Sequence, residues 1–400
     1  MSTSLWRNRD FNLLWGGQVL SAFGSAVSAL AFPLLVLALT GSPLQAGAVG
    51  TIAAVTALLC RLPVGLLVDR VNRRRAMLLV DLARLLAFAA LGLAVLTGSA
   101  GLPAIILVAV LDAAGSTLFS TAEHAALRSI VPAAQLPDAV ARNEARGFAV
   151  GLVGPSAGGL LFGLGHAVPF LGNALTYLGS LISVALIRRP LQEERSQTPG
   201  GLTTGLRFVF GDPFLRAVLV IAAPLNFAIT GILFTIVIAL QQRGVAPAVI
   251  GLTETMIGVG GLIGAIAAPT LQRRLGLGPL VRTICWAAAG LFLLSALLTG
   301  SIAAAVPVAV MMVLAPACNA ALFGYQAAIT PDHLQGRVIS VIFLFATSAA
   351  AVAPLLAGVL TSTWNATAAT VLFAVAVMVS AVAATVSRGI RTLTPAPALT

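Results

Sequence analysis

The stretch Gly65-Leu66-Leu67-Val68-Asp69-Arg70-Val71-Asn72-Arg73-Arg74-Arg75 decides the fold of this chain. It is a short, strongly charged turn between two long apolar segments, one beginning at Ala46 and the other at Ala76. Arg61 is the only charged residue in the segment before the turn. Water must surround the turn, whereas lipid or protein must surround its flanks. The stretch therefore predicts two membrane helices joined by a hydrated loop.

Composition extends this prediction to the whole chain. Its 400 residues are 59% hydrophobic and 9% charged, with a mean hydropathy of +1.02, whereas soluble domains carry roughly 25% charged residues. Apolar runs of about 20 residues recur, which is the length of a membrane-spanning helix. The alternating pattern of a membrane β-barrel is missing from the sequence. We therefore expect an all-α polytopic membrane protein.

The hydrophobic runs predict twelve membrane spans. They lie at residues 11–40, 46–68, 76–98, 102–123, 139–163, 167–187, 214–240, 247–270, 277–299, 302–328, 336–360 and 364–387. An even number of spans places both termini on one side. The basic residues are all arginines and only Arg243 falls in an outward loop, so the positive-inside rule places both termini in the cytoplasm. The net charge of +11 thus reflects topology, and we expect no nucleic-acid partner.

A polar link between the sixth and seventh spans divides the chain into two halves. We expect an N-terminal six-helix half at 1–188, a cytoplasmic linker at 189–213, and a C-terminal six-helix half with a short cytoplasmic tail at 214–400. Residues 202–210 of the linker predict a short amphipathic helix at the inner surface, with Arg207 among the headgroups. Motifs echo between the halves, which favours two parallel repeats with substrate bound between them.

The charged turn resembles the loop G-x-L-A-D-R-x-G-R-R between the second and third helices of the major facilitator superfamily. Asn72 stands where that family usually has glycine, which is a mild departure because asparagine tolerates left-handed backbone better than most residues. The resemblance implies a conformational latch on the cytoplasmic side, with the alternative that the arginines only fix topology. The latch residues are Gly65, Asp69, Arg70, Arg73 and Arg74.

The fifth span contains the motif G-P-x-x-G-G that is typical of antiporter branches of the same superfamily. Its residues are Gly154, Pro155, Gly158 and Gly159. Proline removes a helical hydrogen bond and kinks the helix, and glycines allow another helix to approach closely. Ordinary packing of small residues is the alternative. With the opening 7–11 and the segment 336–340, the motif makes the chain similar to the bacterial drug:proton antiporters that include macrolide and siderophore exporters.

Charges inside predicted spans are candidates for proton coupling, because an intramembrane charge is costly. The candidates are Asp112, Glu254 and Arg61. Burial favours the neutral form of a carboxylate and a nearby arginine favours the charged form, so Asp112 suits a proton carrier. A permanent Asp112–Arg61 ion pair is the alternative. Asp81 and Arg84, one turn apart, predict a structural pair, and Glu254 either binds a proton or cation or extends to the outer interface.

Sparse polar residues in the first, seventh and tenth spans are candidates for the substrate cavity, with ordinary interhelical hydrogen bonds as the alternative. They are Gln18, Asn226, Asn319, Tyr325 and Gln326. A mostly apolar cavity suits a bulky amphipathic compound better than a sugar. Cys60, Cys285 and Cys318 are interpreted as packing residues, and neither a metal site, a cofactor motif nor a catalytic constellation is visible.

These features lead to one functional expectation. We expect a monomeric secondary active transporter of the bacterial inner membrane, not an enzyme, which exports hydrophobic or amphipathic small molecules in exchange for protons. Its mechanism would be alternating access between two conformations. A proton-coupled importer of the same fold and a non-transporting membrane sensor are the alternatives.

Overall fold

A computed structural model describes residues 5–132, 135–191, 202–331, 334–387 and 390, apart from a few side chains within helices, among them that of Asp69. Twelve spans of the described chain are long and apolar enough to cross a membrane, which confirms the predicted fold class. Large apolar side chains such as Leu164, Ile266 and Leu297 are exposed on these spans, as expected for surfaces that face lipid.

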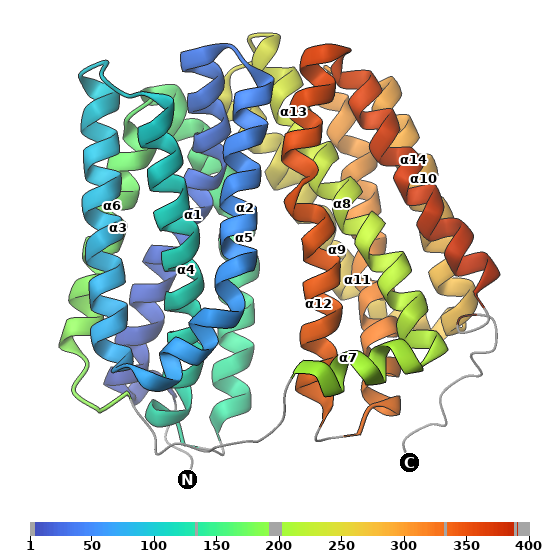
Figure 1. Ribbon diagram of the computed structural model, residues 1–400, viewed down its shortest axis with the longest axis horizontal. Helices are drawn as coiled ribbons and strands as arrows, with labels where there is room; N and C mark the ends of the chain where they lie inside the picture. The colour runs from blue at the N-terminus through green and yellow to red at the C-terminus, as the bar shows by residue number, and fades with distance from the viewer. Residues whose placement is uncertain (1–4, 133–134, 192–201, 332–333, 388–389, 391–400) are drawn as a thin grey trace. The chain divides into compact units, whose positions relative to one another are not determined.

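The chain forms two compact units. The first comprises Met1–Gly41, Ile52–Gln197 and Val245–Thr255, and the second comprises Ser42–Thr51, Thr198–Gly244 and Met256–Thr400. Six long helices precede residue 190: α1 (Arg9–Thr40), α2 (Pro43–Arg70), α3 (Arg73–Leu96), α4 (Leu102–Ile130), α5 (Leu136–Leu164) and α6 (Val168–Leu186). They are followed by α7 (Leu202–Gly211), α8 (Pro213–Gln242), α9 (Pro247–Arg274), α10 (Leu277–Leu297), α11 (Ala305–Ile329), α12 (Gln335–Ala351), α13 (Ala353–Thr363) and α14 (Ala366–Val386) (Figure 1).

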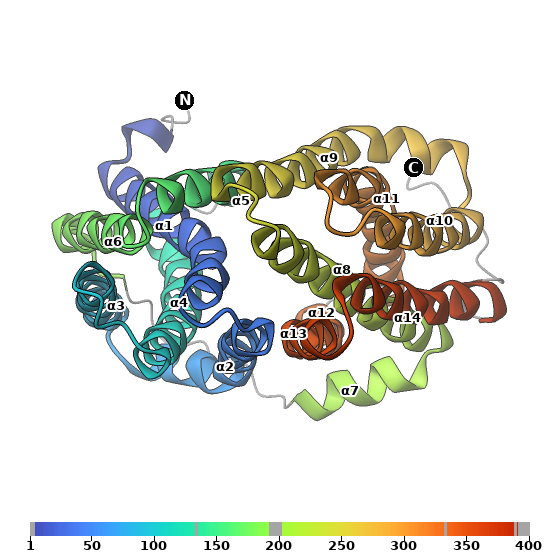
Figure 2. The ribbon, with the colours of Figure 1, turned by 90° about the horizontal axis from the view of Figure 1, so that it is seen from above.

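The same helix packing recurs in the two units. In the first, α1 packs against α4, α5 and α6, and α3 packs against α4 and α6 (Figure 2). In the second, α8 packs against α11, α12 and α14, and α10 packs against α11 and α14. Each unit therefore has one central helix that contacts most of its partners, α1 in the first and α8 in the second.

Asparagine side chains begin two helices of the first unit. The Asn8 side chain accepts a hydrogen bond from the Phe11 amide at the start of α1, and the Asn72 side chain accepts one from the Arg75 amide at the start of α3. Asn72 has φ −66° and ψ 109°, an extended conformation, so this position does not use the left-handed backbone that asparagine tolerates. Asparagine suits this position because it satisfies an amide that the first helical turn leaves without a partner.

The predicted span 336–360 is interrupted in the structure. It consists of α12 and α13, separated at Val352, although the two helices together still form one span. Pro354 explains the break, because proline has no amide hydrogen to donate to the preceding turn. The helical pattern resumes where the Leu356 amide donates to the Val352 carbonyl at 3.2 Å.

The amphipathic helix predicted at 202–210 is present as α7. Figure 1 shows it lying crosswise to α12, against which it packs. Val209 is buried, whereas the Arg207 side chain is exposed. The ring of Phe210 lies 5.7 Å from that of Phe345 on α12, measured between centroids. A helix with one packed face and one exposed basic residue suits the boundary of a membrane.

The Asp10 carboxylate stabilises the chain where it leaves α6. Its Oδ1 and Oδ2 accept hydrogen bonds from the amides of Arg188 and Arg189, at 3.2 and 3.3 Å, and the carboxylate is mostly buried. We expect Asp10→Asn to lower the unfolding free energy by about 1 kcal/mol, because an amide offers a single uncharged acceptor. Thermal unfolding of the purified protein in detergent checks this. Glu144→Gln, at an exposed position of α5, is the control and should melt like the unmodified protein.

Candidate functional site

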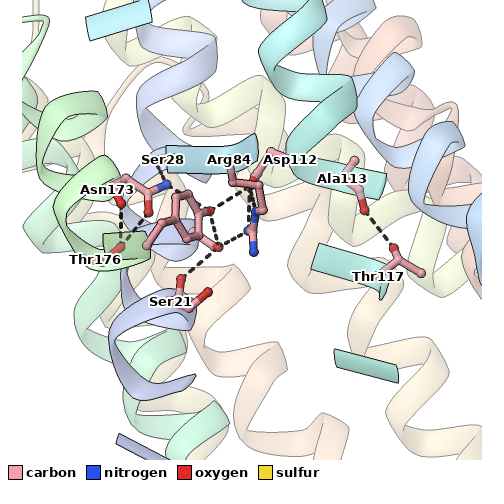
Figure 3. A network of polar contacts seen from close by, with 10 residues as sticks. Ser21, Ser28, Arg84, Asp112, Ala113, Thr117, Asn173 and Thr176 are labelled. Carbon is pink, nitrogen blue, oxygen red and sulfur yellow. Dashed lines mark hydrogen bonds and ion pairs between the residues drawn. The ribbon is translucent and has the colours of Figure 1, made fainter. Parts of the chain in front are cut away.

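Arg84 and Asp112 form a buried ion pair between α3 and α4. Asp112 Oδ1 accepts hydrogen bonds from Arg84 Nε at 2.9 Å and from Arg84 Nη2 at 2.6 Å. Tyr177 of α6 donates a third from its hydroxyl, at 2.8 Å. The Arg84 side chain is 2% exposed and that of Asp112 is 17% exposed, so the carboxylate is the accessible partner. Figure 3 shows this cluster.

Residues of α1 and α6 extend the ion pair into a network across four helices. Arg84 Nη2 donates to Ser25 Oγ at 2.9 Å, and this hydroxyl lies 3.1 Å from the Tyr177 hydroxyl. Asn173 Nδ2 donates to Ser28 Oγ at 2.7 Å and to the Tyr177 hydroxyl at 3.3 Å. We refer to these side chains as the polar network: Ser25, Ser28, Arg84, Asp112, Asn173 and Tyr177.

Packing holds the polar network in place. A Cβ atom added at Gly115, one turn after Asp112, would lie 2.8 Å from Arg84 Cδ, so glycine leaves room for the arginine stem. The Arg84 guanidinium carbon lies 4.0 Å from the centroid of the Tyr177 ring. Phe88 packs edge-to-face on that ring with centroids 5.5 Å apart. Aromatic cover of this kind keeps the ion pair in a low-dielectric setting, where charge interactions are strong.

The ion pairs predicted for this region are corrected by the structure. Asp112 pairs with Arg84 and not with Arg61, which is exposed on α2. Asp81 is fully buried beside Ser180 and interacts with the charge of Arg84, but the two side chains make no direct ion pair in the described part of the chain. The Arg84 side chain is long enough to bind Asp112 on the neighbouring helix instead of Asp81 one turn away, because Gly115 leaves space for its stem. Tyr177 was not predicted from the sequence. The signal available was its position as an isolated tyrosine in an apolar span.

Glu254 lies near the start of α9 and is partly exposed. Its neighbour Thr255 donates from Oγ1 to the Leu152 carbonyl of α5 at 2.9 Å. The described residues give the Glu254 carboxylate neither a hydrogen bond nor an ion pair. Its proposed part in proton or cation binding therefore stays a prediction.

The glycines of the fifth span lie at close helix contacts. Gly154 and Gly158 face α1 at Ala26 and Val27, and a Cβ at Gly158 would lie 2.6 Å from the Val27 carbonyl oxygen. A Cβ at Gly159 would meet the backbone of Pro247 and Gly251, in the segment of α9 that belongs to the first unit. Helix α5 runs through Pro155 without interruption. These contacts agree with the close approach that the motif predicts, while its part in antiport stays a prediction.

Two of the latch arginines bind backbone carbonyls within the first unit. Arg73 Nη1 donates to the carbonyls of Ala125 and Leu191 at 3.4 and 3.2 Å, and Arg74 donates to the Ala185 carbonyl. Arg70 is exposed in the last turn of α2, and nothing lies within 4 Å of a Cβ built on Gly65. The Asp69 side chain lies outside the described residues. The latch therefore stays a prediction, although Arg74 already binds the last turn of α6, as a cation near C-terminal carbonyls does.

A cavity of about 140 Å³ lies among α8, α10 and α11 of the second unit. Asn226 and Asn319, two of the predicted cavity residues, both line it. Asn226 Nδ2 donates to the Ala222 carbonyl at 2.9 Å, which leaves its Oδ1 as an acceptor. The remaining lining is largely apolar and includes Phe292, Met311, Met312 and Cys318. Sequence reasoning missed the two methionines, which are adaptable and polarisable contacts for irregular ligands.

The other predicted cavity residues have different surroundings. Gln326 is buried and donates to Thr330 Oγ1 at 3.0 Å, and the Tyr325 ring packs on Phe214 with centroids 4.6 Å apart. Gln18 is buried in α1, and the described residues give its Oε1 no hydrogen-bond partner. None of these three lines the cavity of the second unit.

Twelve membrane spans, a charged network inside them and an apolar cavity with two amides define a membrane transporter. Residues 2–394 match the transmembrane secretion effector family, so the chain belongs to this family of major facilitator transporters and is not an enzyme. The multidrug efflux pump Tap of Mycolicibacterium fortuitum is 27% identical over 364 residues, which cover 84% of this chain and 85% of that protein.

Solved structures agree on the fold. A bacterial homologue of the human lysosomal transporter Spinster aligns with a TM-score of 0.76 and 17% identity, over 99% of this chain and 100% of that chain. A bacterial homologue of the iron transporter ferroportin aligns with a TM-score of 0.75 and 19% identity, over 96% and 99%. These structures agree with the fold, and the family match confirms the resemblance to the major facilitator superfamily.

Proposed function

We propose that this protein exports hydrophobic or amphipathic small molecules from a bacterial cell in exchange for protons. The observation that carries the proposal is the cavity among α8, α10 and α11, which is apolar except for a few polar groups such as the amides of Asn226 and Asn319. Such a lining suits a bulky amphipathic compound, because a sugar needs many hydrogen bonds. The name of the related protein, a multidrug efflux pump, supports export as the direction.

Asp112 is the proton carrier in this proposal. Its carboxylate is partly accessible and faces Arg84 of α3 and Tyr177 of α6, with Ser25 of α1 bound to the same guanidinium. Asp81 is the other carboxylate nearby, on the same helix as Arg84. Protonation removes the charge that attracts Arg84 and so weakens the link between α3 and α4. A change in this link favours one of two conformations, and substrate favours the other.

The charged loop has a supporting role in the same cycle. We propose that Asp69 and the arginines of this loop hold one conformation until substrate or a proton releases it. Arg73 and Arg74 have the hydrogen-bonding capacity this requires, since both already bind backbone carbonyls of other segments. We further propose a monomer with an N-terminal half at 1–188 and a C-terminal half at 214–400, in the inner membrane with both termini in the cytoplasm, as the arginine distribution favours.

Efflux from whole cells tests the proposed function. We expect cells that express the chain to expel some members of a panel of lipophilic dyes and macrolides. A protonophore should abolish this efflux, because the gradient supplies the free energy, about 2.3 kcal/mol per charge for each 100 mV. Cells with the empty vector are the control. Proton-dependent accumulation in place of efflux would identify an importer, and no flux in vesicles under any imposed gradient would identify a sensor.

A further inference from the structure

The cavity of the second unit is lined by uncharged side chains. Among the described residues that line it, none carries a formal charge. Its polar groups are the amides of Asn226 and Asn319 and the thiol of Cys318, and Cys318 is buried. Asn226 and Asn319 are exposed, so the cavity is open on their side. An organic cation placed against its apolar wall would give up part of its hydration without gaining a counter-charge, which is unfavourable.

The two amides supply both kinds of hydrogen-bonding group. Asn226 Nδ2 donates to a carbonyl of its own helix, so its Oδ1 is available as an acceptor. Asn319 makes no hydrogen bond within the described part of the chain. Amides of this kind pair with carbonyl, phosphoryl or hydroxyl groups of a neutral ligand. Phe292, Met311 and Met312 supply polarisable apolar surface for aromatic rings beside them.

We propose that this cavity binds the uncharged part of the substrate, namely an aromatic or branched apolar group that carries a neutral hydrogen-bond acceptor, and excludes cations. This inference rests on the proposed export function and names the substrate class of the same site. If the absence of a carboxylate sets this preference for neutral ligands over cations, a carboxylate added at Asn226 should reverse the preference.

A matched pair of probes tests the inference by binding alone. Dimethylphenylphosphine oxide is neutral, has a phosphoryl acceptor and carries a single ring that suits a cavity of this volume, whereas trimethylphenylphosphonium has nearly the same shape and a positive charge. We expect equilibrium dialysis with the purified protein in nanodiscs to give at least about tenfold tighter binding of the oxide. Asn226→Asp should invert this preference. Ala315→Phe, which fills the cavity from α11, should abolish binding of the oxide.

Asn365→Asp is the matched control. It adds the same charge to the second unit at the N-cap of α14, where aspartate caps as well as asparagine, so the preference for the oxide should persist. Equal or tighter binding of the phosphonium by the unmodified protein, no binding of the oxide, or no inversion in Asn226→Asp would each overturn the inference. The cell efflux assay is read separately, so the proposed function can stand while this inference fails.

Discussion

Asp112→Asn is expected to abolish efflux driven by a pH gradient while leaving equilibrium binding of substrate unchanged. Asparagine has nearly the same shape and retains an acceptor for Arg84 Nη2 and the Tyr177 hydroxyl, which lie 2.6 and 2.8 Å from Asp112 Oδ1. It has no proton to exchange, so the imposed gradient can no longer bias the two conformations. Flux in proteoliposomes with a pH gradient of either sign, compared with empty liposomes, measures the effect.

The buried partner of Asp112 complicates this experiment. Arg84 is 2% exposed, so the single substitution leaves a buried guanidinium without its counter-charge. Removing one partner of a buried ion pair costs about 3–5 kcal/mol when nothing replaces it. Arg84→Gln combined with Asp112→Asn removes both charges and should recover the thermal stability of the unmodified protein.

The double variant separates coupling from structure. If Asp112 carries the proton, the double variant is stable yet still fails to use the pH gradient. If the pair only joins α3 to α4, the double variant recovers gradient-driven flux together with stability. Recovered flux would remove Asp112 from the proposed mechanism, whatever the single variant does.

The twelve spans could be predicted from the sequence because each depends on local composition. The break between α12 and α13 has a local cause at Pro354, but a proline in a span does not always interrupt it, since α5 continues through Pro155. The loop at Asn72 was recognised from its pattern, yet the backbone conformation there was not, because capping depends on where α3 begins.

The polar network could be predicted only in part. Asp112 stood out as a charge in an apolar run, but its partner depends on which faces of α3 and α4 meet, and this is fixed by packing. The signal available was Gly115, one turn from Asp112, which leaves space for the Arg84 stem. Ser25 and Tyr177 come from helices distant in the sequence, so no spacing connects them to Asp112.

Gly158→Ala is expected to destabilise the protein by about 1–3 kcal/mol, the usual cost of adding volume to a tightly packed contact. The new Cβ would lie 2.6 Å from the Val27 carbonyl oxygen and 3.2 Å from its Cα. Both are backbone atoms, so α1 itself must move. Ser25, two residues before Val27, binds Arg84 Nη2 at 2.9 Å, so the displacement also strains the polar network. The unfolding temperature in detergent and the rate of efflux from cells should both fall.

Helix α5 supplies its own controls for this substitution. A Cβ added at Gly151 or Gly163 meets nothing within 4 Å, and both positions are exposed. Alanine at these positions should leave efflux unchanged and raise stability by about 0.5–1 kcal/mol, because glycine loses more backbone entropy in a helix. The contrast within one helix isolates the contact with α1 from helix propensity. If all three alanine variants melt and transport alike, close approach at Gly158 is not what the motif provides, and its part in transport must depend on the contacts of Gly159 with Pro247 and Gly251.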